Sequence, residues 1–425
     1  MNEKIGVLVF PAGEINSVEL HDALATCVNI RLFGASSVDR HGEYVFKNYI
    51  SNVPMISDYD FITEFNRIID KHSIDVVFPT HDTVVQYLAT HSDEVHAKII
   101  GSDKNTAEIC RDKQKTFDLF KGESFCPKMY SNITELPVFV KPRFGQGAVG
   151  ARKIEDIETI DTDEYVICEY LPGKELTVDC LTDRHRKLKS VLPRSRNRIF
   201  GGVSVSASSE TLTDEIRHIA ETINLKLNFL GLWYFQIKQD VNGEYKLLEI
   251  STRCAGTMCM SRAKGINLPL LSVYAAMGRE IEIAQNPFRV IVDRTLISRY
   301  KIDYKYSRVY IDYDDTIIVN DDIHIPAVHF LYQCRNKGID VILLTRHECD
   351  HDDTVEQSLS KHAICASLFS KILKLSSCET KASVIEPENA VFIDNAYAER
   401  QAVLDCCGIP VFDVDGIEVL LDWRS

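Results

Sequence analysis

Apolar residues in the first hundred positions form short runs, and the segments between them carry apolar residues at about every third or fourth position, as helices do. Strands are predicted at residues 4–10, 29–36, 74–80 and 97–102. Helices are predicted at residues 15–26, 58–72 and 82–91. Strands that alternate with helices form parallel βαβ units. The pattern therefore predicts a doubly wound α/β domain over residues 1–105.

The pattern changes near residue 106, where strands follow one another with few helices between them. Residues 105–121 and 212–225 have helical spacing, and "VNGE" is a turn signal between two strands. Strands are predicted within residues 137–154, 164–182, 187–197, 231–240 and 245–252. A mostly antiparallel α+β domain over residues 106–295 is expected.

A third segment, residues 305–425, returns to alternating strands and helices. Strands are predicted at residues 307–314, 339–345, 390–394 and 409–415. Helices are predicted at 327–338 and 396–408, with further helical material across 352–376. The segment is predicted to be a separate α/β domain.

Composition excludes some classes of protein. A net charge of −14 without a long Lys/Arg block argues against nucleic acid or an anionic membrane surface as a partner. The 13 cysteines are scattered and form no Cys-x-x-Cys, which favours reduced thiols over disulfides or structural zinc. We find no secretory signal and no apolar run near the ~18 residues of a membrane helix. A cytoplasmic protein is expected, and a homodimer is compatible with the sequence.

The stretch "KLLEISTRC" places polar residues within an apolar strand. Side chains two residues apart share a face of a strand, so Glu249, Ser251 and Arg253 are expected to point one way. The other face is expected to carry Leu248, Ile250 and Thr252. An acid and a guanidinium on one face can form a buried ion pair, or they can serve a metal and an anionic group.

A glycine-rich segment, "VFVKPRFGQGAVG", follows a predicted strand. Its glycines are Gly145, Gly147 and Gly150. A dinucleotide fingerprint needs a helix after such a loop, but "ARKI" has the pattern of a returning strand. The better interpretation is a hairpin loop whose backbone N–H groups approach phosphates, with Lys141 adding a positive charge. The alternative is a flexible surface hairpin.

Together with "EYLPGKELTVD" and the "DK" of Asp112 and Lys113, this segment resembles the ATP-grasp superfamily, in particular the branch of the carbamoyl phosphate synthetase large chain. The resemblance covers about residues 1–290. It implies a Rossmann-like pre-ATP-grasp domain, then an ATP-grasp fold, with ATP and Mg²⁺ as cofactors. It also implies activation of a carboxylate as an acyl phosphate, which an amine then attacks.

The resemblance implies a role for each matching residue. Lys113, Lys141 and the glycine loop would contact the nucleotide phosphates. Residues expected at the adenine are Glu169, Tyr170 and Leu171, and the residue expected at the ribose is Glu175.

The same resemblance places the metal ligands on two late strands. Gln236 and Glu249 would hold Mg²⁺, and Arg253 would stabilise the transferred phosphoryl group. Ser251 stands where the family has Asn, and a hydroxyl is a poorer ligand than an amide oxygen. A metal bound there through water, a weakly bound metal and no second metal all remain open.

Three arginines, Arg194, Arg196 and Arg198, alternate in "LPRSRNRIF" and are expected on one face of a strand. Like charges so close repel unless an anion lies among them, and arginine suits bidentate contacts with carboxylates and phosphates. They are candidates for binding the substrate. The alternative is a solvated basic face.

In the last segment, strands end at Asp312 with Asp314 just beyond, at Thr345 and at Asp394, and Lys381 opens a helix. Acids at the carboxyl ends of parallel strands lie where α/β folds bind ligands. The set resembles the haloacid dehalogenase-like (HAD) phosphohydrolase superfamily over residues 305–425, with its Rossmann-like fold.

By that resemblance Asp312 is the nucleophile, Asp314 the general acid and base, and Thr345 and Lys381 bind the phosphoryl group. The implied Mg²⁺ ligands are Asp312, Asp314 and Asp394. Little chain lies between Asp314 and Thr345, so a large cap over this site is not expected.

The sequence thus predicts a bifunctional enzyme, an ATP-dependent carboxylate–amine ligase fused to a phosphatase of the same pathway. Its predicted partners are a small-molecule carboxylate, an amine and a phosphorylated metabolite. Two alternatives remain: a carbamoyl-phosphate or kinase-like use of ATP, and a nucleotide-binding regulatory module with a decayed metal site beside an active phosphatase.

Overall fold

The computed structural model describes residues 4–38, 41–145, 149–350, 352–422 and 424. Its contacts divide the chain into two compact units, residues 1–296 and residues 297–424. The predicted boundary at residue 105 lies inside the first unit, so the division into three domains stays a prediction.

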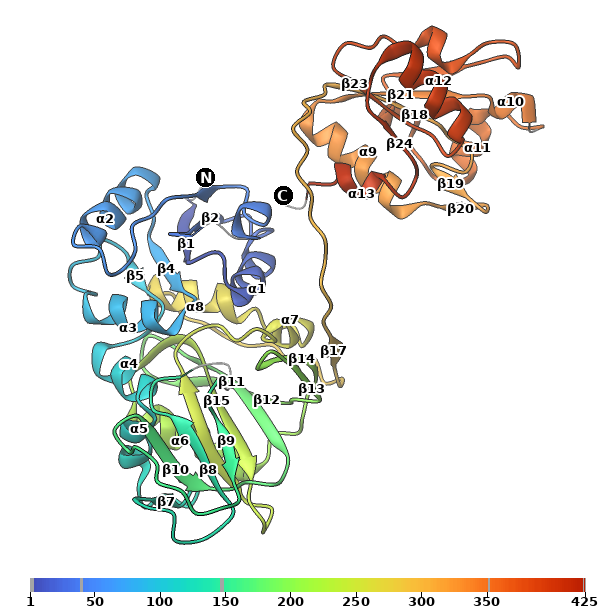
Figure 1. The fold of residues 1–425 in the computed structure, drawn as a ribbon. Coiled ribbons are helices and arrows are strands. Elements are labelled where there is room, and N and C mark those ends of the chain that lie inside the picture. Colours follow the sequence, from blue (N-terminus) through green and yellow to red (C-terminus); the bar gives the residue numbers. More distant parts are fainter. Residues whose placement is uncertain (1–3, 39–40, 146–148, 351, 423, 425) are drawn as a thin grey trace. The chain divides into compact units, whose positions relative to one another are not determined.

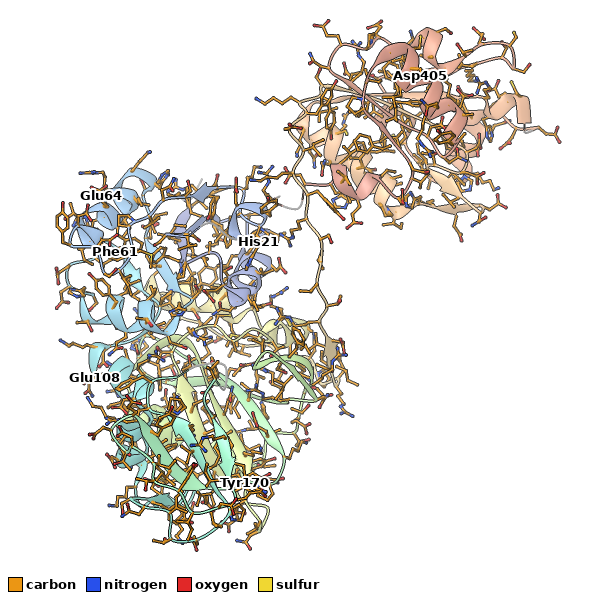
Figure 2. All side chains as sticks on the ribbon, in the orientation of Figure 1. His21, Phe61, Glu64, Glu108, Tyr170 and Asp405 are labelled. Atoms are coloured by element: carbon orange, nitrogen blue, oxygen red, sulfur yellow. The ribbon has the colours of Figure 1, made fainter. Side chains whose placement is uncertain are left out.

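The first unit begins with a parallel sheet of order β3-β2-β1-β4-β5 (Figure 1). Its strands are β1 (Ile5–Phe10), β2 (Ile30–Ala35), β3 (Tyr49–Ile50), β4 (Val76–Pro79) and β5 (Lys98–Ile99). Its helices are α1 (Ile15–Leu24), α2 (Phe61–His72) and α3 (Asp82–Thr90). Phe61, labelled in Figure 2, packs on Phe10 with ring centroids 5.8 Å apart. The predicted alternation of strands and helices is confirmed.

The chain leaves this sheet at Ile100. β6 (Gly101–Ser102) pairs with β15 (Phe229–Gln239) of a second sheet, so one predicted strand serves two sheets. Helices α4 (Lys104–Arg111) and α5 (Lys113–Phe120) follow, separated by Asp112. This direct crossing explains why the first two predicted domains form one compact unit.

Two antiparallel sheets make up most of the rest of the first unit. One has the order β7-β10-β8-β9, with β7 (Met129–Tyr130), β8 (Val138–Pro142), β9 (Arg152–Ile154) and β10 (Tyr165–Glu169). The other has the order β12-β11-β15-β16, with β11 (Glu175–Thr182), β12 (Leu188–Ser195) and β16 (Tyr245–Ser251). The predicted hairpin at the glycine loop is confirmed, since β8 pairs with β9.

The larger antiparallel sheet is amphipathic. On one face, apolar side chains including Val178, Trp233 and Phe235 form a buried core with α6 (Asp214–Lys226). The alternate residues Thr177 and Gln236 lie on the opposite face. One sheet thus supplies a packed core and a polar floor.

A β-bulge changes the predicted faces of "KLLEISTRC". Gln236 pairs with Glu249, but the next residue, Ile237, pairs with Leu247, so Leu248 has no cross-strand partner. Leu247, and not Leu248, joins Ile250 in the core. The prediction that Leu248 and Ile250 share a face is therefore wrong, while Glu249 keeps its place on the polar face.

The remaining elements of the first unit are short. They are β13 (Arg198–Phe200), β14 (Val203–Ser208), β17 (Ile291–Asp293), α7 (Cys259–Ala263) and α8 (Leu268–Ala276). β14 pairs with both β13 and β17.

The second unit is built on a parallel sheet of order β22-β21-β18-β23-β24. Its strands are β18 (Arg308–Ile311), β21 (Asp340–Thr345), β22 (Lys371–Lys374), β23 (Ala390–Ile393) and β24 (Val411–Phe412). Its helices include α9 (Ile325–Lys337), α11 (Val355–Lys361) and α12 (Tyr397–Cys407), and β19 (Ile318–Val319) pairs with β20 (Asp322–Ile323). The predicted helical run over 352–376 is wrong at its end, where "KILK" forms β22.

Candidate active sites

Two cavities of about 160 and 230 Å³ share part of their walls in the first unit, and we call them the first and the second cavity. Residues lining both are Lys113, Gly145, Arg196, Gly202, Gln236 and Glu249. Asp82, Arg111 and Arg253 line only the first cavity. The predicted adenine hinge, Glu169 to Leu171, lines only the second.

The predicted metal ligands are cross-strand partners. Gln236 of β15 lies directly opposite Glu249 of β16, and both side chains reach the wall that the cavities share. In the part of the chain that the structure describes, neither side chain makes a hydrogen bond or ion pair. Two hard oxygen donors free to bind fit Mg²⁺, which commonly takes its other ligands from nucleotide phosphates and water.

Ser251 does not join this pair. It lies opposite Tyr234, and its hydroxyl donates to Asp82 Oδ1 over 3.4 Å. No group of three or more His, Cys, Asp or Glu among the described residues is arranged to hold a metal. The protein therefore offers one carboxylate and one amide to a cation at this wall.

Arg253 is held by an acid that the sequence did not single out. Asp82 Oδ1 accepts from Arg253 Nε over 2.7 Å, and Asp82 Oδ2 accepts from Nη2 over 3.2 Å. Burial acts to raise the pKa of Asp82, but the Arg253 guanidinium outweighs it and holds that pKa below its usual range. The pair is ionised, and it fixes the guanidinium in the wall of the first cavity.

The two predicted phosphate-binding lysines are both buried. Lys113 Nζ donates to the carbonyl of Gly145 over 3.0 Å, and Lys141 Nζ donates to the carbonyl of Leu248 over 2.8 Å. Burial lowers the pKa of Lys113, Glu249 opposes this, and Lys141 adds to it. The bulge frees the Leu248 carbonyl for Lys141, so strand irregularity and lysine position are coupled.

The second cavity gathers the residues predicted at the nucleoside. Tyr170, labelled in Figure 2, has the Lys153 ammonium 4.8 Å from its ring centre. Glu169 accepts from the backbone N–H of Lys128 over 2.8 Å. Glu175 is already engaged by Arg196 at 3.2 Å and Lys238 at 3.7 Å. Of the glycine loop, Gly147 lies outside the described residues, and Gly150 has a positive φ of 77°.

The three arginines do not share one strand, which corrects the prediction. Arg194 ends β12 with Ser195, Arg198 starts β13, and Arg196 lies between the two strands. Each faces its own acid: Arg194 pairs with Asp179 (2.7 Å), Arg196 with Glu175 (3.2 Å) and Arg198 with Asp293 (2.6 Å). Arg194 and Arg198 both pair antiparallel with the same segment, opposite Ser209 and Ser206, and Arg198 is exposed and lines neither cavity.

In the second unit three predicted residues converge. Lys381 Nζ lies 2.9 Å from Asp312 Oδ2 and 2.6 Å from Asp394 Oδ2, and all three side chains are buried. Parallel pairing of β18 with β23 brings the two aspartates together, since Ile311 pairs with Ile393. Burial raises the pKa of Asp312 to about 7; Lys381 opposes this shift and Asp394 adds to it. Burial also raises the pKa of Asp394.

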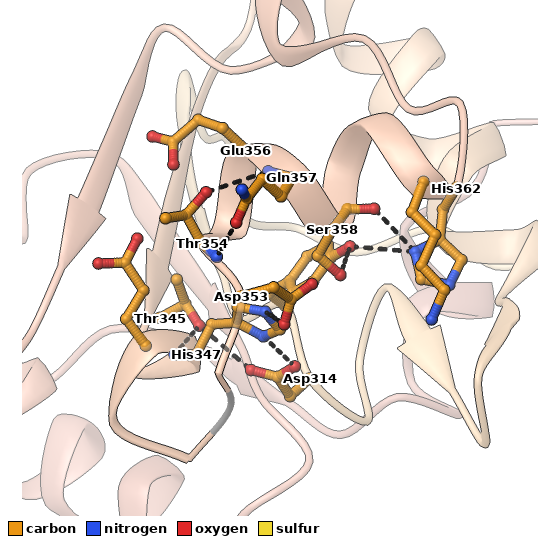
Figure 3. Close-up of polar contacts among 12 residues, drawn as sticks. Asp314, Thr345, His347, Asp353, Thr354, Glu356, Gln357, Ser358 and His362 are labelled. Atoms are coloured by element: carbon orange, nitrogen blue, oxygen red, sulfur yellow. Dashed lines mark hydrogen bonds and ion pairs between the residues drawn. The ribbon is translucent and has the colours of Figure 1, made fainter.

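Asp314 belongs to a separate hydrogen-bonded group, shown in Figure 3. Its Oδ1 lies 2.7 Å from His347 Nδ1, and its Oδ2 accepts from Thr345 over 3.5 Å. The other ring nitrogen of His347 lies 3.2 Å from Asp353. His347 is buried, so the two acids fix the position of its ring. Asp314 and Thr345 thus share His347 as a partner, whereas Asp312 and Asp394 share Lys381.

The group of Asp312, Lys381 and Asp394 is buried and carries more negative than positive charge. Two carboxylates share one ammonium, and the raised pKa values of both aspartates follow from that burial. A divalent cation would remove the excess, and carboxylate oxygens are the ligands Mg²⁺ prefers. The residues therefore fit a Mg²⁺ ion.

Asp82 and His347 were missed by the sequence analysis, although a signal for each was present. Asp82 opens α3 just after β4, and His347 follows β21 by two residues. Both stand at the carboxyl ends of parallel strands, where α/β folds place their ligand sites.

Comparison with known protein families matches part of the first unit. Residues 161–295 match a family described as "ATP-grasp in the biosynthetic pathway with Ter operon". The D-alanine–D-alanine ligase of Actinobacillus pleuropneumoniae serotype 5b (strain L20) is 25% identical over 153 residues, 32% of this chain and 50% of that protein. The chain spans about half the length of the curated relatives it matches.

Solved structures are similar in fold. The biotin carboxylase domain of Hydrogenobacter thermophilus 2-oxoglutarate carboxylase, in complex with MgADP, ADP and bicarbonate, matches with a TM-score of 0.54 at 14% identity over 67% of this chain and 72% of that one. The L-amino acid ligase of Bacillus licheniformis matches with a TM-score of 0.51 at 14% identity over 65% and 74%. These matches support an ATP-grasp fold.

The Staphylococcus aureus N5-carboxyaminoimidazole synthetase, complexed with ADP, is also similar in fold, with a TM-score of 0.54 at 15% identity over 66% of this chain and 79% of that one. ADP in two of these neighbours, and magnesium in one, agree with the predicted cofactors. Among the described residues, no helix has both the length and the apolar character needed to cross a membrane.

Proposed function

We propose that residues 1–296 are an ATP-dependent carboxylate–amine ligase. ATP and Mg²⁺ would occupy the second cavity and the shared wall, and the carboxylate would enter the first cavity. The observation that carries this proposal is the free pair Gln236 and Glu249, which lines both cavities, as Lys113 does, while Arg253 lines the first. The transferred phosphoryl group needs both a cation ligand and positive charge at that position.

In the proposed reaction a carboxylate oxygen attacks the γ-phosphorus of ATP, the bond from that phosphorus to the bridging oxygen breaks, and ADP leaves. The amine nitrogen then attacks the acyl carbon, phosphate leaves, and the nitrogen loses a proton. Lys113 and Lys141 would bind the phosphates, and Arg253 would face the transferred group. Mg²⁺, when bound, neutralises phosphate charge. The glycine loop would exclude water.

Replacing Glu249→Gln tests the site. The carboxylate is lost while the shape is kept, so the Mg²⁺ concentration needed for ADP release should rise at least about tenfold. The matched control is Glu244→Gln on the same hairpin, where the acid is exposed and pairs with Lys246. ADP release by the Glu249→Gln variant with an unchanged Mg²⁺ requirement would contradict the assignment.

Two other uses of the ATP site make different predictions. A kinase-like or carbamoyl-phosphate-type enzyme would release ADP with an acceptor but form no amide. A nucleotide-binding regulatory module, consistent with Ser251 where the family has Asn, would bind ATP without turnover under any carboxylate–amine pair. Product analysis by mass spectrometry separates the three.

We further propose that residues 297–424 are a HAD-like phosphatase. Support comes from the sheet order and from the aspartate–lysine group at the carboxyl ends of β18 and β23. Asp312 would attack the phosphorus of a phosphate ester, and the alcohol would leave with a proton from Asp314. Water would then attack the phosphorus, release phosphate and restore Asp312, with Asp314 taking the proton from that water.

Hydrolysis of p-nitrophenyl phosphate tests this second activity. Asp312→Asn should abolish Mg²⁺-dependent hydrolysis, because the nucleophile is lost. Asp340→Asn, an exposed acid at the start of β21, is the control and should behave as the wild-type protein does. Hydrolysis that persists in the Asp312→Asn variant would exclude Asp312 as the nucleophile.

The two activities are proposed to serve one pathway, with a phosphorylated metabolite passing through both. Cell extract incubated with ATP and the Asp312→Asn protein should accumulate a phosphorylated ligation product, detectable as a new mass. If the two halves act on unrelated compounds, the coupling is wrong even where each activity stands.

A further inference from the structure

The wall of the first cavity carries more cations than acids. Its charged residues are the cations Arg111, Lys113, Arg194, Arg196 and Arg253 and the acids Asp82 and Glu249. Three of the arginines have a carboxylate of their own, as described above: Asp179, Glu175 and Asp82. The positive charge left on the acceptor side therefore comes from another residue.

Arg111 is that residue. It is the last residue of α4, half-buried, and it lines the first cavity but not the second. In the described part of the chain its side chain makes no hydrogen bond or ion pair. Five N–H donors in a cavity wall without an acceptor are a binding opportunity for an oxyanion.

Two acids near Arg111 are already engaged. Glu108, one turn earlier on α4 and labelled in Figure 2, pairs with Lys115. Both oxygens of Asp82 accept from Arg253. The positive charge of Arg111 nonetheless acts on groups in the cavity wall, because it helps to lower the pKa of Asp82 and the pKa of Lys113. An arginine at a helix end complements the helix dipole, but that role needs no place in a cavity wall.

We infer that Arg111 binds a second anionic group of the acceptor substrate, so that the substrate class is a small carboxylate bearing another oxyanion. The inference rests on the proposed ligase function, because the first cavity is the acceptor cavity only in that function. A guanidinium fork donates hydrogen bonds to a carboxylate or to a phosphate, and the experiment separates these two classes of group.

Isothermal titration tests the inference with the full chain. The second cavity is first saturated with Mg²⁺ and AMP-PNP, a non-hydrolysable ATP analogue, and inorganic phosphate or acetate is then titrated as the probe. We expect phosphate or acetate to bind the wild-type protein, and Arg111→Gln to weaken the stronger of the two by about tenfold. Arg111→Lys, which keeps the charge but not the fork, should fall between.

The matched control is Arg217→Gln, an exposed arginine on α6 whose loss changes the net charge equally. Its anion affinity should equal that of the wild-type protein. Equal affinity of the Arg111→Gln variant, with a normal circular-dichroism melt, overturns the inference, as does the absence of saturable binding of either anion to the wild-type protein. Failure to bind AMP-PNP would instead contradict the proposed ATP site, and the anions would then be titrated without nucleotide.

Discussion

Arg253 owes its position to Asp82, a residue 171 positions earlier in the chain. A guanidinium fixed by two hydrogen bonds needs little reorganisation when charge develops at a phosphoryl group. Ser251, which donates to the same acid, adds to this arrangement and not to the metal ligands. The serine that stands where the resemblance leads us to expect Asn thus contacts the acid that holds Arg253.

Asp82→Asn should therefore impair turnover more than nucleotide binding. Without the carboxylate, Arg253 can leave its place, and a small misplacement can cost roughly 100-fold in rate. The measurement is kcat for ADP release beside the Kd of AMP-PNP, which should change little. Asp70→Asn, an exposed acid paired with His96 on the same α/β region, is the control. A parallel loss of AMP-PNP affinity would contradict a positioning role.

Asp312 predicts a pH dependence of stability. Its folded pKa of about 7 lies above the value of about 3.9 expected in the unfolded chain. Ionisation therefore costs the folded state nothing below about pH 4, and the cost grows as the pH rises through 7. Asp312→Asn should raise the free energy of unfolding of the second unit by at most about 4 kcal/mol at pH 8, and by much less at pH 5. The unfolding temperature should rise accordingly.

Scanning calorimetry of the intact chain measures this effect. Mg²⁺ should stabilise the wild-type protein at pH 8 and do less for the Asp312→Asn variant, because the cation offsets the same negative charge. An Asp312→Asn variant equally stabilised at both pH values would show that burial of this carboxyl does not control the stability.

At the scale of elements, Asp112 connects three parts of the proposed nucleotide site. It caps α5 by accepting from Gln114 N over 2.9 Å, and it pairs with Arg143 at 2.6 Å, beside the glycine loop. Lys113 follows it directly and reaches Gly145. One carboxylate therefore holds both the start of the helix that carries Lys113 and the base of the loop that Lys113 contacts.

Two variants of Asp112 separate these roles. Asn remains a good helix cap but cannot pair with Arg143, whereas Ala can do neither. Asp112→Ala should lower the free energy of unfolding by about 1 kcal/mol more than Asp112→Asn, measured by urea unfolding. Both should weaken AMP-PNP binding, because the loop base is freed in both. Equal stabilities would mean that the cap contributes nothing.

Elements were predicted better than their irregularities. The strand over 245–252 and the pairing of Glu249 with a residue of the preceding strand follow from alternation and the turn signal. The bulge at Leu248 does not, because a one-residue slip leaves no mark in the apolar pattern. The split of 97–102 between two sheets, and the β22 strand, depend on partners far along the chain.

Side-chain partners were the least predictable feature. Motif resemblance led to the predictions for Lys113, Glu249, Asp312 and Lys381. It gave no reason to expect Asp82 beside Arg253 or an acid for each arginine. These contacts depend on how strands and helices pack, and local sequence does not encode that packing.

At the scale of the whole molecule, the residues assigned to each proposed site all come from one unit. Residues 294–307 join the units without regular secondary structure, and Leu296 and Ile297 in this connection are 97% and 70% exposed. Exposed irregular segments are preferred sites of proteolysis.

Limited proteolysis should therefore cut between β17 and β18 and leave two folded fragments. Each fragment should keep its own activity, which is ADP release for the first and p-nitrophenyl phosphate hydrolysis for the second. The reason is that the residues assigned to each site come from one unit. Mass spectrometry identifies the cut, and activity is measured on the separated fragments. Loss of either activity on cleavage would show that the sites depend on each other.

The Asp82–Arg253 ion pair also limits how this protein can be recombined with its relatives. The acid comes from the leading parallel sheet region and the arginine from the strand region that carries Glu249, so the two regions share one functional contact. A chimera that exchanges the leading region would keep Arg253 but lose Asp82. Such a chimera would need an aspartate at the start of its third helix before a change in acceptor specificity could be measured.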